Sequence, residues 1–412
     1  MKRLPTIAVA AGILAIAALA AAEDWPKWRG PRGDNITSGD GLLTEWAGGG
    51  PREVWRVEVG AGYSTPVIVD DVIYLFTQAE RTDTLVALSA DDRRVLWRQS
   101  YRTGFHDRRY SGTRATPTVE GDRIYTYGGG CDLTCWSRAD GQIVWRTNIL
   151  EKTGATKGIT WGAAGSPLIV GDVIYVQGGK DGPVAAAVNK TNGELLWKAD
   201  APGPGGYATI AATTVDGRDQ LLVFGGTTLY GLDPRRGETL WRLPYETQYQ
   251  VNAATPIIRG GKAFITHGYN KGKGTLLALE PRSVSKVWEN ERIRSRFVTP
   301  ILEGDVMYAN SRGTLKCVRW ADGSLVWACD DPKLNLGLGG SLIRAGDLLI
   351  TLSERGMLSL VHATPDGWSL RGQVRLFKEK QTWSTPVVYN GRLYVKGNRE
   401  LVCLDIAAKA DK

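Results

Sequence analysis

Short apolar stretches that alternate with polar residues follow one another along most of the chain, and polar turns that often contain Gly separate them. A strand with one buried face produces this two-residue alternation. Beyond the N-terminal leader, no segment keeps the 3.6-residue apolar period of an amphipathic helix. The pattern therefore predicts an all-β protein with little helix.

One unit of this pattern recurs along the chain. Each copy opens with a motif such as Ser-Thr-Pro-Val-Ile at residues 64–68, and most copies close on Leu-Trp or Val-Trp. Eight copies, 42 to 51 residues apart, align at Pro66, Pro117, Pro167, Ala212, Pro256, Pro300, Leu342 and Pro386. Eight units with four strands each are typical of a β-propeller. We therefore predict an eight-bladed β-propeller of four-stranded blades.

The last unit ends after its third strand, at residues 401–405, without a closing Trp. The missing strand stands near the other end of the chain, where residues 51–60 hold Trp55 in the same context. Pairing the two segments closes the ring and removes an exposed sheet edge that would otherwise template aggregation. We predict that an N-terminal strand completes the last blade, so that the propeller spans residues 53–412.

A Trp residue closes most of the units. A large aromatic side chain at one fixed place in each blade buries much area and locks neighbouring blades together. We therefore predict a structural docking role, and no ligand contact, for Trp55, Trp97, Trp145, Trp197, Trp241, Trp288 and Trp327.

The first 22 residues differ from the rest of the chain. A basic start at Lys2 and Arg3 precedes an apolar run, Ile7–Ala22, that ends on small residues. These features are typical of a cleavable secretory signal peptide. An uncleaved membrane anchor is the alternative, but the run is shorter than the roughly 20 residues that a spanning helix needs. We predict a signal peptide at residues 1–22 and a periplasmic or secreted protein.

Residues 23–52, here called the N-terminal extension, join the leader to the first predicted strand and contain Trp25, Pro26, Trp28 and Pro31. The seventh unit lacks both the opening Pro and the closing Trp, so it is either the loosest joint of the ring or a blade that another segment covers. We predict that the extension packs as a clasp across the seventh or the eighth blade.

The motif Gly-Leu-Asp-x-x-x-Gly-x-x-x-Trp at residues 231–241 resembles the tryptophan-docking repeat of the PQQ-like (quinoprotein) eight-bladed propellers. The segment Asp-Trp-Pro-x-Trp-Arg-Gly-Pro at residues 24–31 is similar to a leader segment of exported members of that superfamily. The resemblance covers nearly all of the chain after the leader, and it implies the propeller fold. Because one fold hosts unrelated functions, it does not decide the activity.

Two branches of this superfamily differ in activity. One contains dehydrogenases that bind pyrroloquinoline quinone with calcium, and the resemblance implies for them an adjacent Cys-Cys pair, a stacking Trp, carboxylate and Asn calcium ligands and an Asp base. The other contains cofactor-free scaffolds such as the outer-membrane assembly lipoprotein BamB. This chain has no Cys-Cys pair, no Asp/Asn cluster with calcium-loop spacing and no Cys directly after the leader to carry a lipid. We therefore predict a non-catalytic BamB-like scaffold without a cofactor, and we keep a dehydrogenase with pyrroloquinoline quinone and calcium as the alternative.

The chain holds five Cys and three His residues. Cys135 stands where other units have Ala or Gly, a position typical of a small buried side chain. Cys131 lies across a short hairpin from Cys135, so two alternatives remain, a disulfide between Cys131 and Cys135 or two free thiols. The His residues lie in different units without metal-ligand spacing, so we predict no metal site.

The formal net charge is +8, and the excess of Lys and Arg lies in the connections between successive units. In a propeller these connections emerge on one face, around the mouth of the central channel; we call it the funnel face. A concave mouth with one sign of charge attracts anionic ligands, and Arg beside aromatic rings suits carboxylates and phosphates. The alternative is that these charges only solvate the loops. We predict ligand contacts from Arg108, Arg109, Arg114, Trp161, Arg294, Arg296 and Trp383.

These observations predict an exported, non-catalytic binding scaffold that takes an anionic protein, polymer or small-molecule ligand on its funnel face. We also predict a monomer, an association with the cell envelope and no nucleic-acid partner, because the chain is exported.

Overall fold

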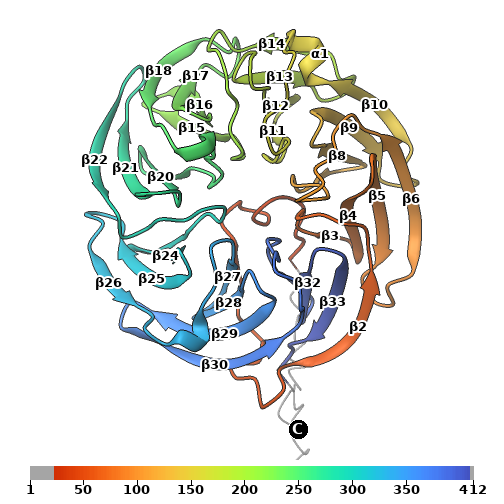
Figure 1. The fold of residues 1–412 in the computed structure, drawn as a ribbon, viewed down its shortest axis with the longest axis vertical. Coiled ribbons are helices and arrows are strands. Elements are labelled where there is room, and N and C mark those ends of the chain that lie inside the picture. Colours follow the sequence, from red (N-terminus) through yellow and green to blue (C-terminus); the bar gives the residue numbers. More distant parts are fainter. Residues whose placement is uncertain (1–22, 409–412) are drawn as a thin grey trace, which may run out of the picture.

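The computed structural model describes residues 23–408, so the predicted signal peptide lies outside the described residues. Eight sheets stand around a central axis as the blades of a propeller (Figure 1), and the four strands of each blade run antiparallel. Helical structure among these residues is limited to α1 (Ile149–Thr153) and two single turns, η1 (Gln248–Gln250) and η2 (Pro332–Leu334). Within this part of the chain, no helix has the length and apolar character needed to cross a membrane. The predicted all-β, eight-bladed propeller is confirmed.

The blades follow one another around the ring in chain order. The first four consist of β3 (Val67–Val69), β4 (Val72–Ala79), β5 (Thr82–Ser89) and β6 (Val95–Arg102); β7 (Thr118–Glu120), β8 (Arg123–Tyr127), β9 (Asp132–Ser137) and β10 (Ile143–Asn148); β11 (Leu168–Val170), β12 (Val173–Gln177), β13 (Ala185–Asn189) and β14 (Leu195–Lys198); and β15 (Ala211–Val215), β16 (Arg218–Phe224), β17 (Thr228–Leu232) and β18 (Thr239–Pro244). The next three consist of β19 (Ile257–Arg259), β20 (Lys262–His267), β21 (Lys273–Leu279) and β22 (Val284–Asn290); β23 (Ile301–Glu303), β24 (Val306–Ser311), β25 (Thr314–Arg319) and β26 (Leu325–Ala328); and β27 (Ser341–Ala345), β28 (Leu348–Leu352), β29 (Met357–Thr364) and β30 (Gly367–Arg375).

The eighth blade is built from both ends of the described chain. Its sheet order is β2 (Arg52–Glu58), β33 (Glu400–Asp405), β32 (Arg392–Lys396) and β31 (Val387–Tyr389). β2 and β33 run antiparallel, with Arg52 opposite Asp405 and Glu58 opposite Glu400. The predicted closure by an N-terminal strand is confirmed, and β2 lies within residues 51–60.

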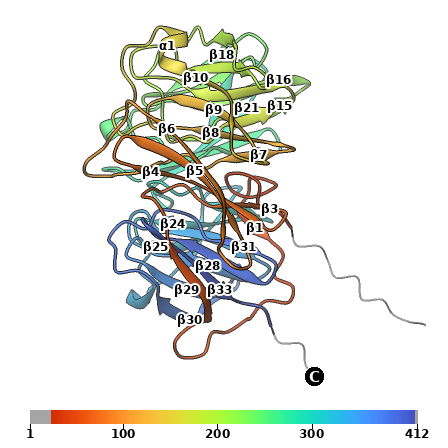
Figure 2. The same ribbon diagram turned by 90° about the vertical axis from the view of Figure 1, so that its right-hand side faces the viewer.

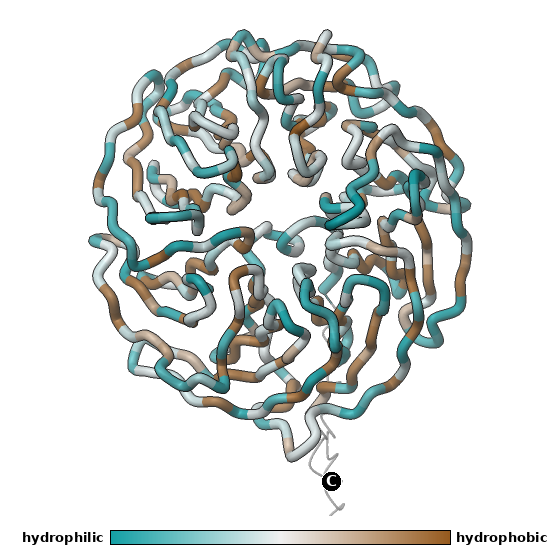
Figure 3. Tube along the Cα trace, viewed as in Figure 1, coloured by the Kyte–Doolittle hydropathy of each residue, from teal (hydrophilic) through white to brown (hydrophobic). Residues whose placement is uncertain are grey.

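Short hydrophobic stretches recur in every blade, with more hydrophilic segments between them (Figure 3). Burial is deep in the inner strands of the blades, and every residue of β24 and of β28 is buried. These strands have a neighbouring blade packed on each face, so they lose the alternation that a half-exposed strand shows. The core of the protein therefore lies between the blades, and the axis is left to the connections.

The closing Trp residues tie seven of the eight blades to the next blade. Six of the seven indole N–H groups donate a hydrogen bond of 2.8–3.2 Å to a backbone carbonyl oxygen of the following blade. In four cases the indole also covers a turn Gly of that blade, for example Gly193 beneath Trp145. Gly193 has a φ of 75°, and an added Cβ would lie 2.6 Å from the indole, so both its backbone conformation and the close contact require Gly.

Trp241 is the exception, and the sequence of the fifth blade explains why. The turn that should receive it, residues 280–284, contains no Gly. The indole N–H instead donates to the Gln220 side-chain oxygen of its own blade at 2.7 Å, and the Gln220 amide donates to the Glu280 carbonyl oxygen at 2.8 Å. The Gln220 side chain thus links Trp241 of the fourth blade to the backbone of the fifth blade.

The cysteine side chains are buried and free. Cys135 lies in β9, where it is paired with Trp145 of β10, in the small slot that the closing Trp requires. Of the two alternatives for Cys131 and Cys135, the structure has free thiols. A strand rises about 3.3 Å per residue, so β9 carries Cys135 well away from Cys131, beyond the roughly 7 Å between Cα atoms that a disulfide tolerates.

The N-terminal extension runs along the face opposite the funnel face. In the side view, α1 marks the funnel face on the left, and β1 (Ile36–Thr37) lies toward the right (Figure 2). Trp25 is buried and exchanges two backbone hydrogen bonds with Ile68 of β3, at 2.8 and 3.0 Å. The Pro26 carbonyl oxygen accepts the backbone N–H of Val119 in the second blade.

The extension then crosses the axis and reaches the far blades. β1 adds a parallel strand to the inner edge of β27 in the seventh blade, and the Leu43 N–H donates to the Ile406 carbonyl oxygen of the eighth blade at 2.8 Å. The predicted contacts with the seventh and eighth blades are therefore present. Trp25, however, packs at the first blade, and Trp28 lies at the axis, because the segment spans the ring instead of lying along one blade.

Candidate functional site

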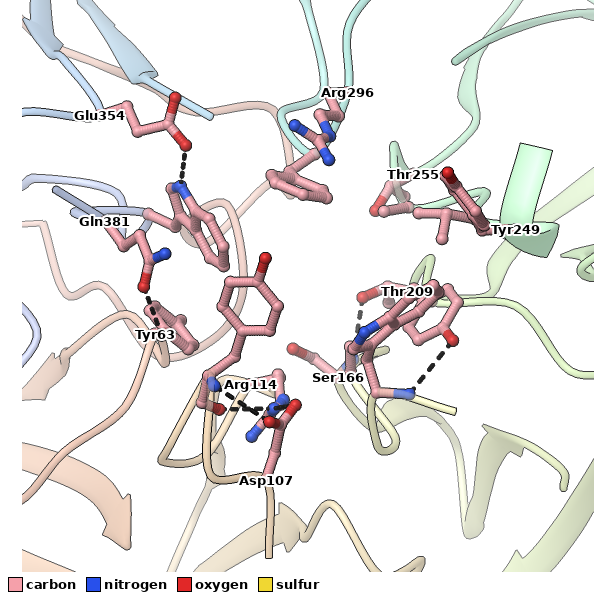
Figure 4. Close-up of a pocket in the computed structure, with 18 of the residues that line it drawn as sticks. Tyr63, Asp107, Arg114, Ser166, Thr209, Tyr249, Thr255, Arg296, Glu354 and Gln381 are labelled. Carbon is pink, nitrogen blue, oxygen red and sulfur yellow. Dashed lines mark hydrogen bonds and ion pairs between the residues drawn. The ribbon is translucent and has the colours of Figure 1, made fainter. Parts of the chain in front are cut away.

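A cavity of about 590 Å³ opens on the funnel face at the axis of the ring (Figure 4). Its wall comes from the connections between blades and from two hairpin turns, β20–β21 and β28–β29. None of its lining residues lies in a strand. The cavity is therefore a loop-built site on a rigid scaffold, which is the usual arrangement of binding sites.

Eight aromatic rings form a continuous belt along the cavity wall. Neighbouring ring centroids in it are 4.7 to 6.4 Å apart, a range in which aromatic rings attract one another. This aromatic belt consists of Tyr63, Tyr110, Trp383, Phe297, Tyr269, Tyr249, Trp161 and Tyr207. It offers a ligand nonpolar faces and edges on several sides.

Two arginines of the cavity have no ion-pair partner among the described residues. The Arg296 guanidinium lies over Tyr269 and Phe297, 4.4 and 5.0 Å from their ring centroids, and its Nε is buried without a hydrogen-bond partner. The Arg109 guanidinium lies 5.3 Å from the centroid of Tyr110. Because the rings displace water but do not neutralise the charge, both cations remain available to an anion.

Arg114 has a different role. It forms an ion pair with Asp107 at 3.1 Å, and Asp107 also accepts the backbone N–H groups of Arg109 and Tyr110. The Arg114 side chain is only 11% exposed, and burial lowers its pKa from the ordinary arginine value, although Asp107 opposes this shift. The pair therefore shapes the loop that presents Arg109, and both carboxylate oxygens of Asp107 are occupied.

Glu354 positions one ring of the aromatic belt. One carboxylate oxygen accepts the indole N–H of Trp383 at 2.9 Å, and the other accepts the Leu338 N–H at 2.9 Å. Glu354 lies in the turn between β28 and β29, and Figure 4 shows it pointing at the indole from the edge of the cavity. Its charge is thus committed to holding Trp383.

A series of hydroxyl groups links the blades around the axis, and two of its members, Ser166 and Thr209, line the cavity. The backbone N–H groups of Thr385, Thr65, Thr116 and Ser166 donate to the hydroxyl groups of Thr65, Thr116, Ser166 and Thr209, respectively, at 2.9–3.1 Å. Each bond joins one blade to the next. The bond to Thr209 also shows how the fourth unit aligns with the others. Ala208-Thr209-Ile210 is equivalent to the Ala-Thr-Pro of other units. Ile210 therefore occupies the Pro position, two residues before Ala212, which the sequence alignment had placed there.

Trp28 of the N-terminal extension forms the floor of the cavity. Its indole N–H donates to the Thr255 hydroxyl at 3.2 Å. A second cavity of about 630 Å³ lies on the other side of it, between residues 26–34 and the inner strands of the second to sixth blades. Trp28, Ser166, Thr209 and Thr255 line both cavities, so Trp28 divides the axial channel in two.

The structure brings together five of the seven predicted ligand contacts. Arg109, Arg114, Trp161, Arg296 and Trp383 line the cavity. Arg108 is exposed outside it, and Arg294 also lies outside the lining and pairs with Glu291 at 3.3 Å.

Sequence reasoning missed most of the aromatic belt and both hairpin contributions. Tyr269 and Glu354 belong to the hairpins between second and third strands, which emerge on the same face as the connections. A signal was present for the Tyr residues, because Tyr63, Tyr110, Tyr207 and Tyr249 all occur in connections.

The cavity residues do not fit pyrroloquinoline quinone with calcium. Its two carboxylates, Asp107 and Glu354, are occupied by protein donors, and no Cys lines it. Among residues 23–408, no group of three or more His, Cys, Asp and Glu side chains is arranged to hold a metal ion. A site for the quinone and its calcium is therefore not formed by these residues.

Fold and site together define a closed eight-bladed propeller with a loop-built cavity on its axis. Comparison with known families then places it: a family model described as "Outer membrane protein assembly factor BamB" matches residues 81–329. Since this match covers more than half of the chain, the protein belongs to that family.

Two curated relatives carry the same name. The protein from Alkalilimnicola ehrlichii is 26% identical over 210 residues, which are 50% of this chain and 51% of that protein. The chain thus aligns with about half the length of this relative. The protein from Yersinia pestis is 24% identical over 370 residues, 84% of this chain and 86% of that protein.

Solved structures show the same fold at low sequence identity. BamB from Moraxella catarrhalis is similar with a TM-score of 0.61 and 14% identity, over 86% of this chain and 99% of that one. A europium-containing methanol dehydrogenase is similar with a TM-score of 0.69 and 11% identity, over 93% and 98%. Because BamB and a methanol dehydrogenase share the fold, these structures support the architecture alone.

Proposed function

We propose that this protein is an exported, non-catalytic binding scaffold of the cell envelope, and that its cavity on the funnel face holds an anionic ligand or partner segment. The name of the curated relatives, outer membrane protein assembly factor, supports a scaffold role of this kind. In this proposal residues 1–22 are the signal peptide that directs export, residues 23–52 are the extension, and the propeller acts as a monomer in the periplasm.

The two unpaired cations in the aromatic belt carry the proposal. A guanidinium group that is partly removed from water and has no carboxylate partner gains more from an anion than a solvated one does, because the local screening is weaker. Arg296, which is half-buried, meets this description, and the exposed Arg109 supplies a second unpaired cation on the other side of the same cavity. Arg114 is neutralised by Asp107 and contributes by shaping the loop.

Calorimetric titration with three anionic probes tests the proposal: amidated hexaglutamate, hexagalacturonate, and pyrroloquinoline quinone with calcium. The double variant Arg109→Gln/Arg296→Gln removes both unpaired cations. The matched control, Arg235→Gln/Arg236→Gln, removes two exposed arginines from the β17–β18 turn on the opposite face. We expect at least one probe to bind wild type and control alike, and to bind the cavity variant about tenfold or more weakly.

Salt provides a second readout in the same titrations. Affinity for the wild type should fall as salt rises, and the fall should be shallower for the cavity variant, since two charges no longer contribute. Binding of none of the three probes, or equal binding to the cavity variant, would contradict an anion site in this cavity. Binding of the quinone alone, with calcium required, would favour the dehydrogenase alternative.

A further inference from the structure

We infer that the occupant of the cavity is an acidic oligosaccharide, a sugar chain that bears carboxylate or sulfate groups. This inference rests on the proposed function, since it names the ligand class of the same site. Four features of the cavity carry it: the tilt of the rings, the spare hydroxyl donors, the placement of the two cations and the absence of a free strand edge.

The rings of the aromatic belt do not form a flat slot. Tyr63 and Trp383 are tilted by 35°, Phe297 and Trp383 by 54°, and Tyr249 meets Trp161 at 87°. A planar heteroaromatic ligand requires near-parallel faces above and below it. Sugar rings are puckered and carry C–H groups on both faces, and the negative faces of aromatic rings attract such groups. The belt therefore suits sugars better than flat rings.

The base of the cavity offers hydrogen-bond donors to a hydroxyl-rich ligand. The oxygens of Ser166, Thr209 and Thr255 accept bonds from backbone or indole N–H groups. Their own O–H groups have no acceptor within residues 23–408, and all three side chains line the cavity. Three free hydroxyl donors at one end of an aromatic cavity match the alternating polar and nonpolar surface of a sugar chain.

The two unpaired arginines lie on opposite sides of the axis. Arg109 belongs to the connection between the first and second blades, and Arg296 to that between the fifth and sixth, four positions apart in a ring of eight. Both line the same cavity from its two sides. A chain that repeats its negative charge meets both at once, which favours an oligosaccharide over a single acidic sugar.

An extended peptide is less suited to this cavity. Peptides are commonly held by main-chain hydrogen bonds to a free strand edge, and no lining residue of the cavity lies in a strand. Recognition here has to come from side chains, as it does when a ligand presents rings and hydroxyl groups in place of a regular backbone.

Tyr249 at the rim provides a residue-level test of the stacking. Its side chain is 60% exposed, and it and Gln250 have φ values of 63° and 60°. Two consecutive non-glycine residues in the left-handed region store backbone strain, which occurs more often at ligand-binding sites than elsewhere. Because the side chain is exposed, Tyr249→Ala leaves the core intact. Leu196→Ala on β14, 49% exposed and outside the cavity, is the matched control.

The experiment titrates wild type, Tyr249→Ala and Leu196→Ala with four probes: hexagalacturonate, a sulfated chondroitin hexasaccharide, amidated hexaglutamate and neutral maltohexaose. We expect at least one acidic saccharide to bind wild type about tenfold or more tightly than hexaglutamate and maltohexaose. Tyr249→Ala should weaken that binding about fivefold to tenfold, and Leu196→Ala should not change it. The two acidic saccharides distinguish carboxylate from sulfate.

Each of the remaining outcomes contradicts the inference. If hexaglutamate binds as tightly as either acidic saccharide, the oligosaccharide inference is wrong while the anion-binding function stands. If maltohexaose binds as tightly as the acidic saccharides, the negative charge of the ligand does not contribute to recognition, and the inference is wrong. If none of the anionic probes binds, the inference and the proposed function both fail. An acidic saccharide that binds Tyr249→Ala as well as it binds wild type removes the stacking argument on which the inference depends.

Discussion

At the scale of single residues, the buried carboxyl group of Asp83 makes the stability of the fold depend on pH. Asp83 is fully buried in β5, where one oxygen accepts the Gln78 amide N–H at 2.7 Å. Burial raises its pKa to about 6; the Gln78 hydrogen bond lowers it, and the charge of Asp132 on the second blade raises it again. The folded protein therefore holds this proton over a pH range in which the unfolded chain has already lost it.

The sign of the effect follows from this difference. Between about pH 4 and pH 6 the folded state binds more protons than the unfolded state, so the contribution of Asp83 to stability falls as pH rises. Above pH 6 the protein holds a buried carboxylate. We expect Asp83→Asn to raise the free energy of unfolding at pH 7.5 by about 1–2 kcal/mol, and to make little difference at pH 4.

Urea unfolding at the two pH values measures this prediction. Asp216→Asn is the control, because Asp216 is exposed in the β15–β16 turn and Asn also tolerates its left-handed backbone. If Asp83→Asn raises the free energy of unfolding equally at pH 4 and pH 7.5, the buried carboxyl group does not titrate in this range.

At the scale of elements, the contact between the fourth and fifth blades depends on one amide. Gln220 accepts from the Trp241 indole and donates to the Glu280 carbonyl oxygen. We expect Gln220→Met, which keeps the volume but removes both bonds, to lower the free energy of unfolding by about 1–3 kcal/mol, because two buried polar groups lose their partner. Chemical denaturation measures it, and Gln142→Met on an exposed turn is the control. An unchanged stability would mean that the indole finds another acceptor.

The strands and the closing Trp positions were predictable from sequence because every blade repeats the same burial pattern. The entrance of the fourth blade was not, since Ile210 replaces the Pro that marks the others and the alignment slipped by two residues. Of the cavity, the sequence placed Arg109, Arg296, Trp161 and Trp383 on one face. It did not place Tyr269 or Trp28, because only the closed ring brings a hairpin and the N-terminal extension to the axis.

At the scale of the whole molecule, the N-terminal extension links blades that are far apart in the ring. It contacts the first and second blades through Trp25 and Pro26, the seventh through β1, and the eighth through Leu43. We expect deletion of residues 23–44 to lower the thermal unfolding temperature by several degrees, because it removes these bonds and exposes the inner edge of β27.

Circular dichroism melting curves measure this effect, and Trp28→Ala is the comparison. That variant opens the floor of the cavity but keeps β1, so its unfolding temperature should lie between those of the deletion and the wild type. If the deletion variant unfolds at the same temperature as the wild type, the extension does not stabilise the closed ring.

The closure of the eighth blade also sets an order of events during synthesis. β2 is made early, and its partner β33 is made about 350 residues later. Because ribosomes add about 5–20 residues per second, β2 waits about 20–70 s for that partner. β1 waits in the same way for β27. Ring closure thus acts as a test of completeness: a chain released before its last strand keeps open edges that chaperones and proteases recognise, and only a finished chain hides them.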